Sequence, residues 1–202
     1  MRASLGAGHP MGFILQTNRA TMQVRHGRCG AAIPVYAAAL ARARELGHPQ
    51  SDQIEGALGA CLSEQGDTHA ALPHLETAVA GLARERAASE PALNRMQSAL
   101  GLVRFRTGQR ELGEREIRAA LARLESAGFD RSDDYAEAAV DLALVLEASD
   151  RRRLAREWRT RSLQAFTSVY GADHPRTRIA QAALDGVSVQ AASGGAQASA
   201  RR

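Results

Sequence analysis

The segment LGACLSEQGDTHAALPHLETAV, residues 58–79, decides how the rest of the chain is interpreted. It sets a Leu-Gly pair, a glycine turn and two alanines at fixed distances, and mostly helix-forming residues lie between them. These positions recur at steps of 39, 42 and 42 residues, which indicates an internal repeat. The recurring small and turn residues are Ala20, Gly59, Gly101 and Ala143; Gly27, Gly66, Gly108 and Asp150; Ala32, Ala71, Gly113 and Ala155; and Ala39, Ala78, Ala120 and Ser162.

Each repeating unit is expected to form two helices joined by a short turn. Proline at the first helical position loses only an N–H that has no partner there, and its φ is already helical. A single helix pair cannot bury its apolar face, so neighbouring pairs must stack. The sequence therefore predicts an all-α solenoid of about four antiparallel helix pairs and a capping helix. The predicted helix starts are Pro10, Pro49, Pro91, Asp133 and Pro175.

Composition supports this fold class. The 202 residues are 45% hydrophobic but only 4% aromatic, and Ala, Leu and Arg, which favour helices over strands, dominate. The formal net charge of +4 does not by itself indicate nucleic-acid binding. The N-terminus does not resemble a signal peptide, and no apolar run approaches the roughly 20 residues of a membrane helix. We therefore expect a cytoplasmic location and no membrane partner.

The repeat resembles the tetratricopeptide repeat (TPR). The resemblance rests on residues 58–79 and on the matching segment 100–121. The longer period and the segment GADHPRT, residues 171–177, resemble the lengthened kinesin-light-chain-like subtype, which is common in bacterial signalling proteins. The resemblance covers roughly residues 5–187 and implies a right-handed solenoid that binds other proteins.

The repeat register also divides the chain. It predicts units at residues 8–46, 47–88, 89–130 and 131–172 within a solenoid spanning 8–187, with a capping helix at 173–187. Residues 1–7 align in phase with the segment before His174 and are interpreted as the remnant of a preceding repeat. Residues 188–202 are rich in Ala, Ser and Gly and are predicted to be a disordered tail.

The fourth unit departs from the pattern. Arg159 stands at the position that Tyr36, Leu75 and Ile117 occupy in the other units. The neighbouring Trp158 is expected to take the core place, with a slight rotation of that helix.

In the family that the repeat resembles, the first helix of each pair lines a concave groove that holds a partner peptide. In the third unit, Phe105 flanked by Arg95 and Arg106 would suit a ligand that carries an acidic group beside an apolar side chain. The alternative is that Phe105 packs between repeats and the arginines are solvated. The same register places in this groove Arg25, Gln53 and Ser98, and also Thr17, Thr21, Gly56, Ala60, Glu64, Leu102, Glu137, Val140, Leu144 and Glu147.

A second candidate surface is the arginine-rich segment 151–161. It holds six arginines, against Asp150 just before it and Glu157 within it. Arg152, Arg156 and Arg159 share one helical face and could bind phosphate or an acidic partner. The alternative is a solvated outer face of the last unit.

No arrangement in the sequence points to catalysis. There is no phosphate-binding glycine loop, nucleophile elbow, HExxH motif or paired-carboxylate motif, so we expect no enzyme activity, cofactor or metal. His69 and His74 are five residues apart and do not share a helical face. Cys29 and Cys61 lack a CxxC or zinc spacing and are predicted to be reduced, with Cys61 in the core.

The sequence thus predicts a scaffold that binds another protein or peptide, of acidic character if the groove arginines are used. By resemblance, it would be the docking part of a bacterial signalling or regulatory protein. One alternative is a helical repeat that binds nucleic acid or an acidic partner with the face formed by segment 151–161, although only Trp158 supplies the interleaved aromatic residue that nucleic acid favours. Another is a self-associating spacer, because a first helix near 11–26 without a preceding repeat exposes Phe13, Ile14 and Leu15.

Overall fold

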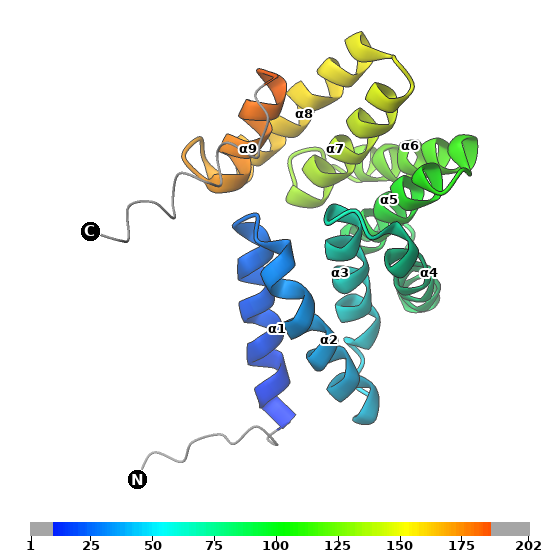
Figure 1. Ribbon diagram of the computed structural model, residues 1–202, viewed down its shortest axis with the longest axis vertical. Helices are drawn as coiled ribbons and strands as arrows, with labels where there is room; N and C mark the ends of the chain where they lie inside the picture. Colours follow the sequence, from blue (N-terminus) through cyan, green and yellow to red (C-terminus); the bar gives the residue numbers. More distant parts are fainter. Residues whose placement is uncertain (1–9, 187–202) are drawn as a thin grey trace.

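The computed structural model describes residues 10–186, and these form nine helices and no strand (Figure 1). Eight helices pair in chain order, and α9 (Pro175–Leu184) follows the last pair. The predicted all-α solenoid of about four helix pairs and a capping helix is confirmed. The pairs are α1 (Pro10–Arg25) with α2 (Cys29–Glu45), α3 (Ser51–Glu64) with α4 (Thr68–Glu85), α5 (Pro91–Arg106) with α6 (Arg110–Ser126), and α7 (Asp133–Ala148) with α8 (Arg152–Tyr170).

The predicted remnant at 1–7 and the predicted tail at 188–202 lie outside the described residues. The residues at which each unit begins and ends stay a prediction. Within residues 10–186, no helix combines the length and apolarity that crossing a bilayer demands.

The prolines and histidines at the unit starts set where the first helices begin. The second predicted start was wrong by two residues, because α3 begins at Ser51 and not at Pro49. The His48 ring accepts the Gln50 N–H at Nδ1, 3.2 Å away, so the residues between them form a turn that precedes the helix. His174 caps α9 in the same way. The other four helices begin at the predicted residues, Pro10, Pro91, Asp133 and Pro175.

The turn inside each pair requires a left-handed backbone. Gly27, Gly66 and Gly108 have φ angles of 71°, 87° and 102°, and Asp150 takes the same conformation in the fourth pair with φ of 55°. Aspartate is one of the few residues besides glycine that tolerate this region. The four residues are the turn residues that the repeat predicts.

Close approach of the two helices depends on small residues, most strictly in the third pair. A Cβ on Gly113 would overlap the Gly101 carbonyl oxygen and would lie 2.7 Å from the backbone nitrogen of Phe105. A Cβ on Gly101 would in turn lie 2.7 Å from the Gly113 carbonyl oxygen. The backbones of α5 and α6 therefore touch directly, and the aliphatic side chains on either side of this crossing fill the core.

The core of the fourth pair is filled by different residues from those of the other pairs. Tyr36, Leu75 and Ile117 are fully buried, whereas the Arg159 side chain at the equivalent position is partly exposed and pairs with Glu147 at 2.6 Å. Trp158 packs against the core of the last two pairs, as expected, but is only partly buried.

The first helix exposes less apolar surface than the sequence suggested. The prediction was wrong for Phe13, which is buried because its ring packs edge-on against His48 in the connection between α2 and α3, with ring centroids 4.9 Å apart. Ile14 is partly buried. Leu15 is 57% exposed, and Met22, seven residues later, is 51% exposed.

The last helix reaches back to the first pair, so that the solenoid curls until its ends touch (Figure 1). Arg176 of α9 donates from Nε and Nη2 to the Val24 carbonyl at 3.2 and 2.9 Å. The His174 ring stacks on His26 with centroids 5.6 Å apart. The repeat register predicts a cap on the last pair only, and it did not foresee this second contact.

We expect Gly113→Ala to lower the free energy of unfolding by about 1–3 kcal/mol, the usual cost of overpacking. The added methyl group would overlap the Gly101 carbonyl, and neither backbone can move without separating α5 from α6. Urea denaturation followed by circular dichroism measures the change. Gly30→Ala in α2 is the matched control, because its Cβ would meet only the flexible Gln65 side chain. Equal stability of the two variants would contradict the close approach.

Candidate partner-binding site

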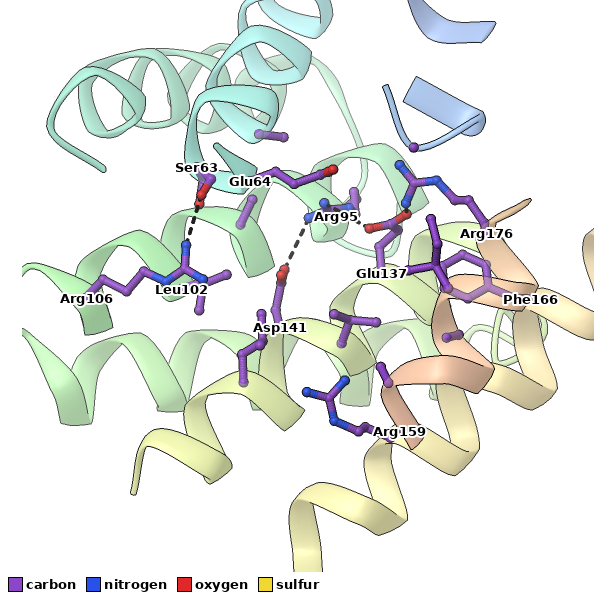
Figure 2. Close-up of a pocket in the computed structure, with 18 residues that line it drawn as sticks. Ser63, Glu64, Arg95, Leu102, Arg106, Glu137, Asp141, Arg159, Phe166 and Arg176 are labelled. Atoms are coloured by element: carbon purple, nitrogen blue, oxygen red, sulfur yellow. Dashed lines mark hydrogen bonds and ion pairs between the residues drawn. The ribbon is translucent and has the colours of Figure 1, made fainter. Parts of the chain in front are cut away.

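The first helices of the last three pairs, α3, α5 and α7, form an inner wall that α9 faces. Between them lies a cavity of about 350 Å³ (Figure 2). Its apolar lining includes Leu102 of α5, Val140 and Leu144 of α7, and Ile179 of α9. A second cavity of about 290 Å³ adjoins the first, and residues common to the two linings are Ala60, Glu64, Arg95, Glu137 and Arg176.

A buried ion pair joins α5 to α7 at this inner wall. Arg95 donates to the Asp141 carboxylate at 3.2 Å and to Glu137 at 3.4 Å, and the Ser98 hydroxyl donates to Asp141 at 2.9 Å. Burial raises the pKa of Asp141, while Arg95 and the Ser98 hydroxyl oppose that shift. Removing one partner of such a buried pair leaves an uncompensated charge, so Arg95 is held by structure and is not available to a ligand.

Glu137 extends the ion pair to the last helix. Its carboxylate also pairs with Arg176 of α9, whose guanidinium holds the Val24 carbonyl at the end of α1. Burial lowers the pKa of Arg176, and the nearby Glu64 carboxylate acts in the opposite direction. The chain Arg95–Glu137–Arg176 therefore ties α5, α7, α9 and α1 together across the inner surface.

Arg106 differs from these two arginines. It is exposed, and Nη1 donates to the Ser63 carbonyl at 2.9 Å. Among the described residues it forms no ion pair. Figure 2 shows it beside Leu102 at the edge of the cavity. A carboxylate would be a stronger acceptor for this guanidinium than the neutral carbonyl is.

Three of the predicted groove residues, Phe105, Ser98 and Gly56, are buried in packing instead. Phe105 is 6% exposed and belongs to the core, and the Arg110 guanidinium carbon lies 5.3 Å from its ring centroid. The prediction of an exposed aromatic anchor was wrong, because this position turns away from the groove toward α6. Phe105 is a packing residue, as the alternative interpretation held, but it packs against α6 of its own pair as well as within the core that the last pair shares. Ser98 is also fully buried, and its hydroxyl donates a hydrogen bond to Asp141.

The remaining predicted groove residues are spread over the inner surface. Arg25 is exposed and lines the second cavity. Gln53 is partly buried near the start of α3 and is not among the residues that line either cavity, because the opposite end of α3 forms that wall. The structure therefore brings Arg95 and Arg106 together at the main cavity and leaves Gln53 apart.

Nearby carboxylates largely neutralise the arginine-rich segment. Arg152, Arg156 and Arg159 do lie along one hollow, beside Leu184 of α9, as their shared helical face predicts. The ion pairs of the segment are Arg151–Glu114, Arg152–Asp150, Arg153–Glu157, Arg159–Glu147 and Arg161–Glu125. This pairing weakens the case for phosphate or nucleic acid on this face.

Sequence reasoning missed two residues that organise the site. Asp141 stands inside the apolar run VDLALVL, residues 140–146, and a lone carboxylate in such a run indicates a buried partner. In the sequence, Arg176 contributes only to the segment that supports the family resemblance. No neighbouring residue indicates that its guanidinium contacts α1.

The second cavity holds an unusual carboxylate. Asp134 lies in the first turn of α7, and burial and the neighbouring Asp133 raise the pKa of Asp134 to about 6. Arg95 opposes the shift without cancelling it. This carboxylate therefore titrates near neutral pH.

Stacked antiparallel helix pairs around a curved inner surface define the class of α-solenoid repeat proteins. Residues 1–84 match the family model of the tetratricopeptide repeat. The match covers the first two helix pairs, and the fold of the described residues is that of kinesin-light-chain-like repeats. Such repeats generally mediate protein–protein interaction and are typically non-enzymatic scaffolds.

Solved structures share the fold. Kinesin-light-chain TPR-like repeats from Podosopora anserina, nearly identical to one another, superpose with a TM-score of 0.58 at 18% identity and cover 95% of this chain and 92% of that chain. BtubC (BKLC) from P. vanneervenii gives a TM-score of 0.55 at 16% identity and covers 91% of this chain and 82% of that one. No curated protein sequence matches the chain.

We expect Asp134→Asn to stabilise the protein above pH 6. The folded-state pKa of Asp134, about 6, exceeds its ordinary value of 3.8, so the stability that the protonated group contributes is lost as the pH rises through 6. Asparagine avoids this loss, so it should add nothing below pH 4, an amount that grows between pH 4 and 6, and about 3 kcal/mol at pH 7. Urea denaturation across this range measures the difference. The exposed Asp130→Asn is the control, and the same pH profile in both variants would contradict burial as the cause.

Proposed function

We propose that this chain is a scaffold that binds a partner protein or peptide on its inner surface, with Arg106 as the cation that meets an acidic group of the partner. The observation that supports the proposal most directly is the exposed Arg106 guanidinium beside a cavity with apolar lining. Arg95 and Arg176 point into the same cavity, but each already pairs with carboxylates of the chain.

The size of the cavity limits how a partner would bind. About 350 Å³ lies near the lower end of the roughly 300–1,000 Å³ of small-molecule sites. It would accept one or two side chains and not a length of peptide. We therefore place the partner's main chain along the rim near Ser63 and Arg106, with an apolar side chain inserted toward Leu102 and Leu144 and an acidic one on Arg106.

A role within a bacterial signalling or regulatory protein also belongs to this proposal. Its support is the resemblance of the repeat, and of residues 171–177, to kinesin-light-chain-like repeats. The chain would supply the docking surface, and any catalytic activity would reside on another protein or domain.

We expect Arg106→Glu to abolish selection of acidic peptides. Peptides displayed on phage would be selected against the wild type, and their affinities would be measured by fluorescence polarisation. Wild type should select an acidic residue beside an apolar one, and Arg106→Glu should bind those peptides at least about tenfold more weakly, since a charge-assisted hydrogen bond is lost.

The control for this experiment is Arg115→Glu, an exposed arginine on α6 outside both cavities. It makes the same charge change without touching the inner surface, so its peptide affinities should equal those of the wild type. If both variants bind equally well, the inner surface is not the binding site. Arg95→Glu is unsuitable, because it would break the buried pair with Asp141.

Self-association is the second candidate function, and the exposed face of α1 favours it. Leu15 and Met22 are seven residues apart and lie on the same side of this helix. The proposed contact would bury this face against a second copy of the chain.

We expect the double change Leu15→Gln, Met22→Gln to shift the molecular mass in solution toward the monomer, because it removes the apolar surface of that contact. Light scattering after size-exclusion chromatography, over a range of protein concentrations, measures the mass. Val169→Gln on α8, which replaces another exposed apolar side chain, is the control. A wild type that is monomeric at every concentration would exclude this candidate.

A further inference from the structure

Two cysteines from different helix pairs lie in direct contact. Cys29 is the first residue of α2 in the first pair, and Cys61 lies in α3 of the second pair. Their Sγ atoms are 2.6 Å apart, and both residues are free thiols. They are 2% and 1% exposed. The whole chain contains only these two cysteines, so an internal disulfide can form only between them.

The thiols are buried but lie at the wall of a cavity. Both line the second cavity, together with Tyr36, Arg95 and Glu64. Cys29 donates its S–H to Glu64 Oε2 at 3.2 Å. A molecule as small as hydrogen peroxide could therefore reach the sulfurs from the inner surface, and a carboxylate acceptor for the Cys29 proton is already in place.

We propose that Cys29 and Cys61 form a redox modification site, which a hydroperoxide converts from two thiols into one disulfide. First, one thiol loses its proton and its sulfur attacks a peroxide oxygen. The O–O bond breaks, water leaves and a sulfenic acid forms. The second sulfur then attacks the sulfenic sulfur, the S–O bond breaks and a second water leaves. The two sulfurs together lose two electrons, which reduce the peroxide to two waters.

The surroundings set the rate of this reaction. The hydrogen bond with Cys61, burial and the Glu64 carboxylate all raise the pKa of Cys29 well above the usual range of a thiol. Since the thiolate is the nucleophile, oxidation is slow at neutral pH and accelerates as the pH rises. These thiols therefore respond to sustained oxidant and not to a brief pulse.

A metal ion is the other ligand that two thiols suggest. Among the residues that the structure describes, no three His, Cys, Asp or Glu side chains are grouped so that they could hold one. A structural zinc site requires four ligands. The disulfide needs only the two sulfurs, which are already in contact.

The disulfide would fasten the first pair to the second. It would join the start of α2 to the last turn of α3, near Ala60 and Glu64, which line both cavities. Closing a loop between residues 29 and 61 restricts the unfolded chain and stabilises the folded one. Oxidation would thus fix the angle between these two pairs at the inner surface.

The test is oxidation of the whole folded chain with hydrogen peroxide, followed by alkylation of the remaining thiols and mass spectrometry. We expect two alkylated cysteines before treatment and none after it, a mass lower by two hydrogens, and a tryptic peptide that links Cys29 to Cys61. Dithiothreitol should restore both thiols. The thermal midpoint of the oxidised form should rise by about 5 °C or more, and the oxidation rate should grow by up to tenfold per pH unit between pH 7 and 9.

Cys61→Ser and Cys29→Ser are the matched variants. Each should be unable to form the linked peptide and should show no rise in midpoint after peroxide. The proposal is overturned if the wild type gives sulfinic acid or disulfide-linked dimers without the internal link. It is also overturned if both thiols survive prolonged peroxide in the folded protein while reacting once it is unfolded in urea.

Discussion

The close approach of the two helices of a pair, which brings their backbones into direct contact in the third pair, is the constraint on which the rest of the structure depends. In the third pair Gly101 and Gly113 place each backbone against the other, and no side chain larger than hydrogen fits between them. The other pairs hold glycine or alanine at the equivalent positions. This spacing fixes how each pair presents its apolar faces, and so fixes how the pairs stack and how strongly the solenoid curves. The inner cavity is a consequence of that curvature.

Polar contacts then determine what the inner surface offers. Of the arginines that face the main cavity, Arg95, Arg159 and Arg176 are paired with carboxylates of the chain, and Arg106 holds only a backbone carbonyl. Most of the arginines on the inner surface therefore form ion pairs that hold helices together. The same holds on the outer face of α8, where a segment rich in arginine is close to neutral once its ion pairs are formed. Counting charges along a sequence overestimates what remains for a partner.

The fold could be predicted from the repeat, because each turn and each helix start is determined by residues close to it in the sequence. A turn residue such as Gly66 or Asp150, or a helix start such as Pro91, depends only on nearby backbone, and the register located them within two residues. The site was harder to predict, because it depends on which side of each helix faces a neighbour in space. Phe105 looked like a groove residue by register, yet it packs against α6. The contact between Arg176 and Val24 joins residues 152 positions apart, and no periodic pattern encodes it.

The long-range contact between Arg176 and Val24 changes how the repeat array is expected to unfold. An open solenoid has two free ends, each helix pair interacts only with its neighbours, and the end pairs fray first. Here α9 rests on the turn of the first pair, so the array has no independent end on that side. Loss of the first pair would also release the last helix, and the reverse holds as well. Unfolding should therefore be more cooperative than in a linear array of the same length, because fraying at either end costs contacts at both.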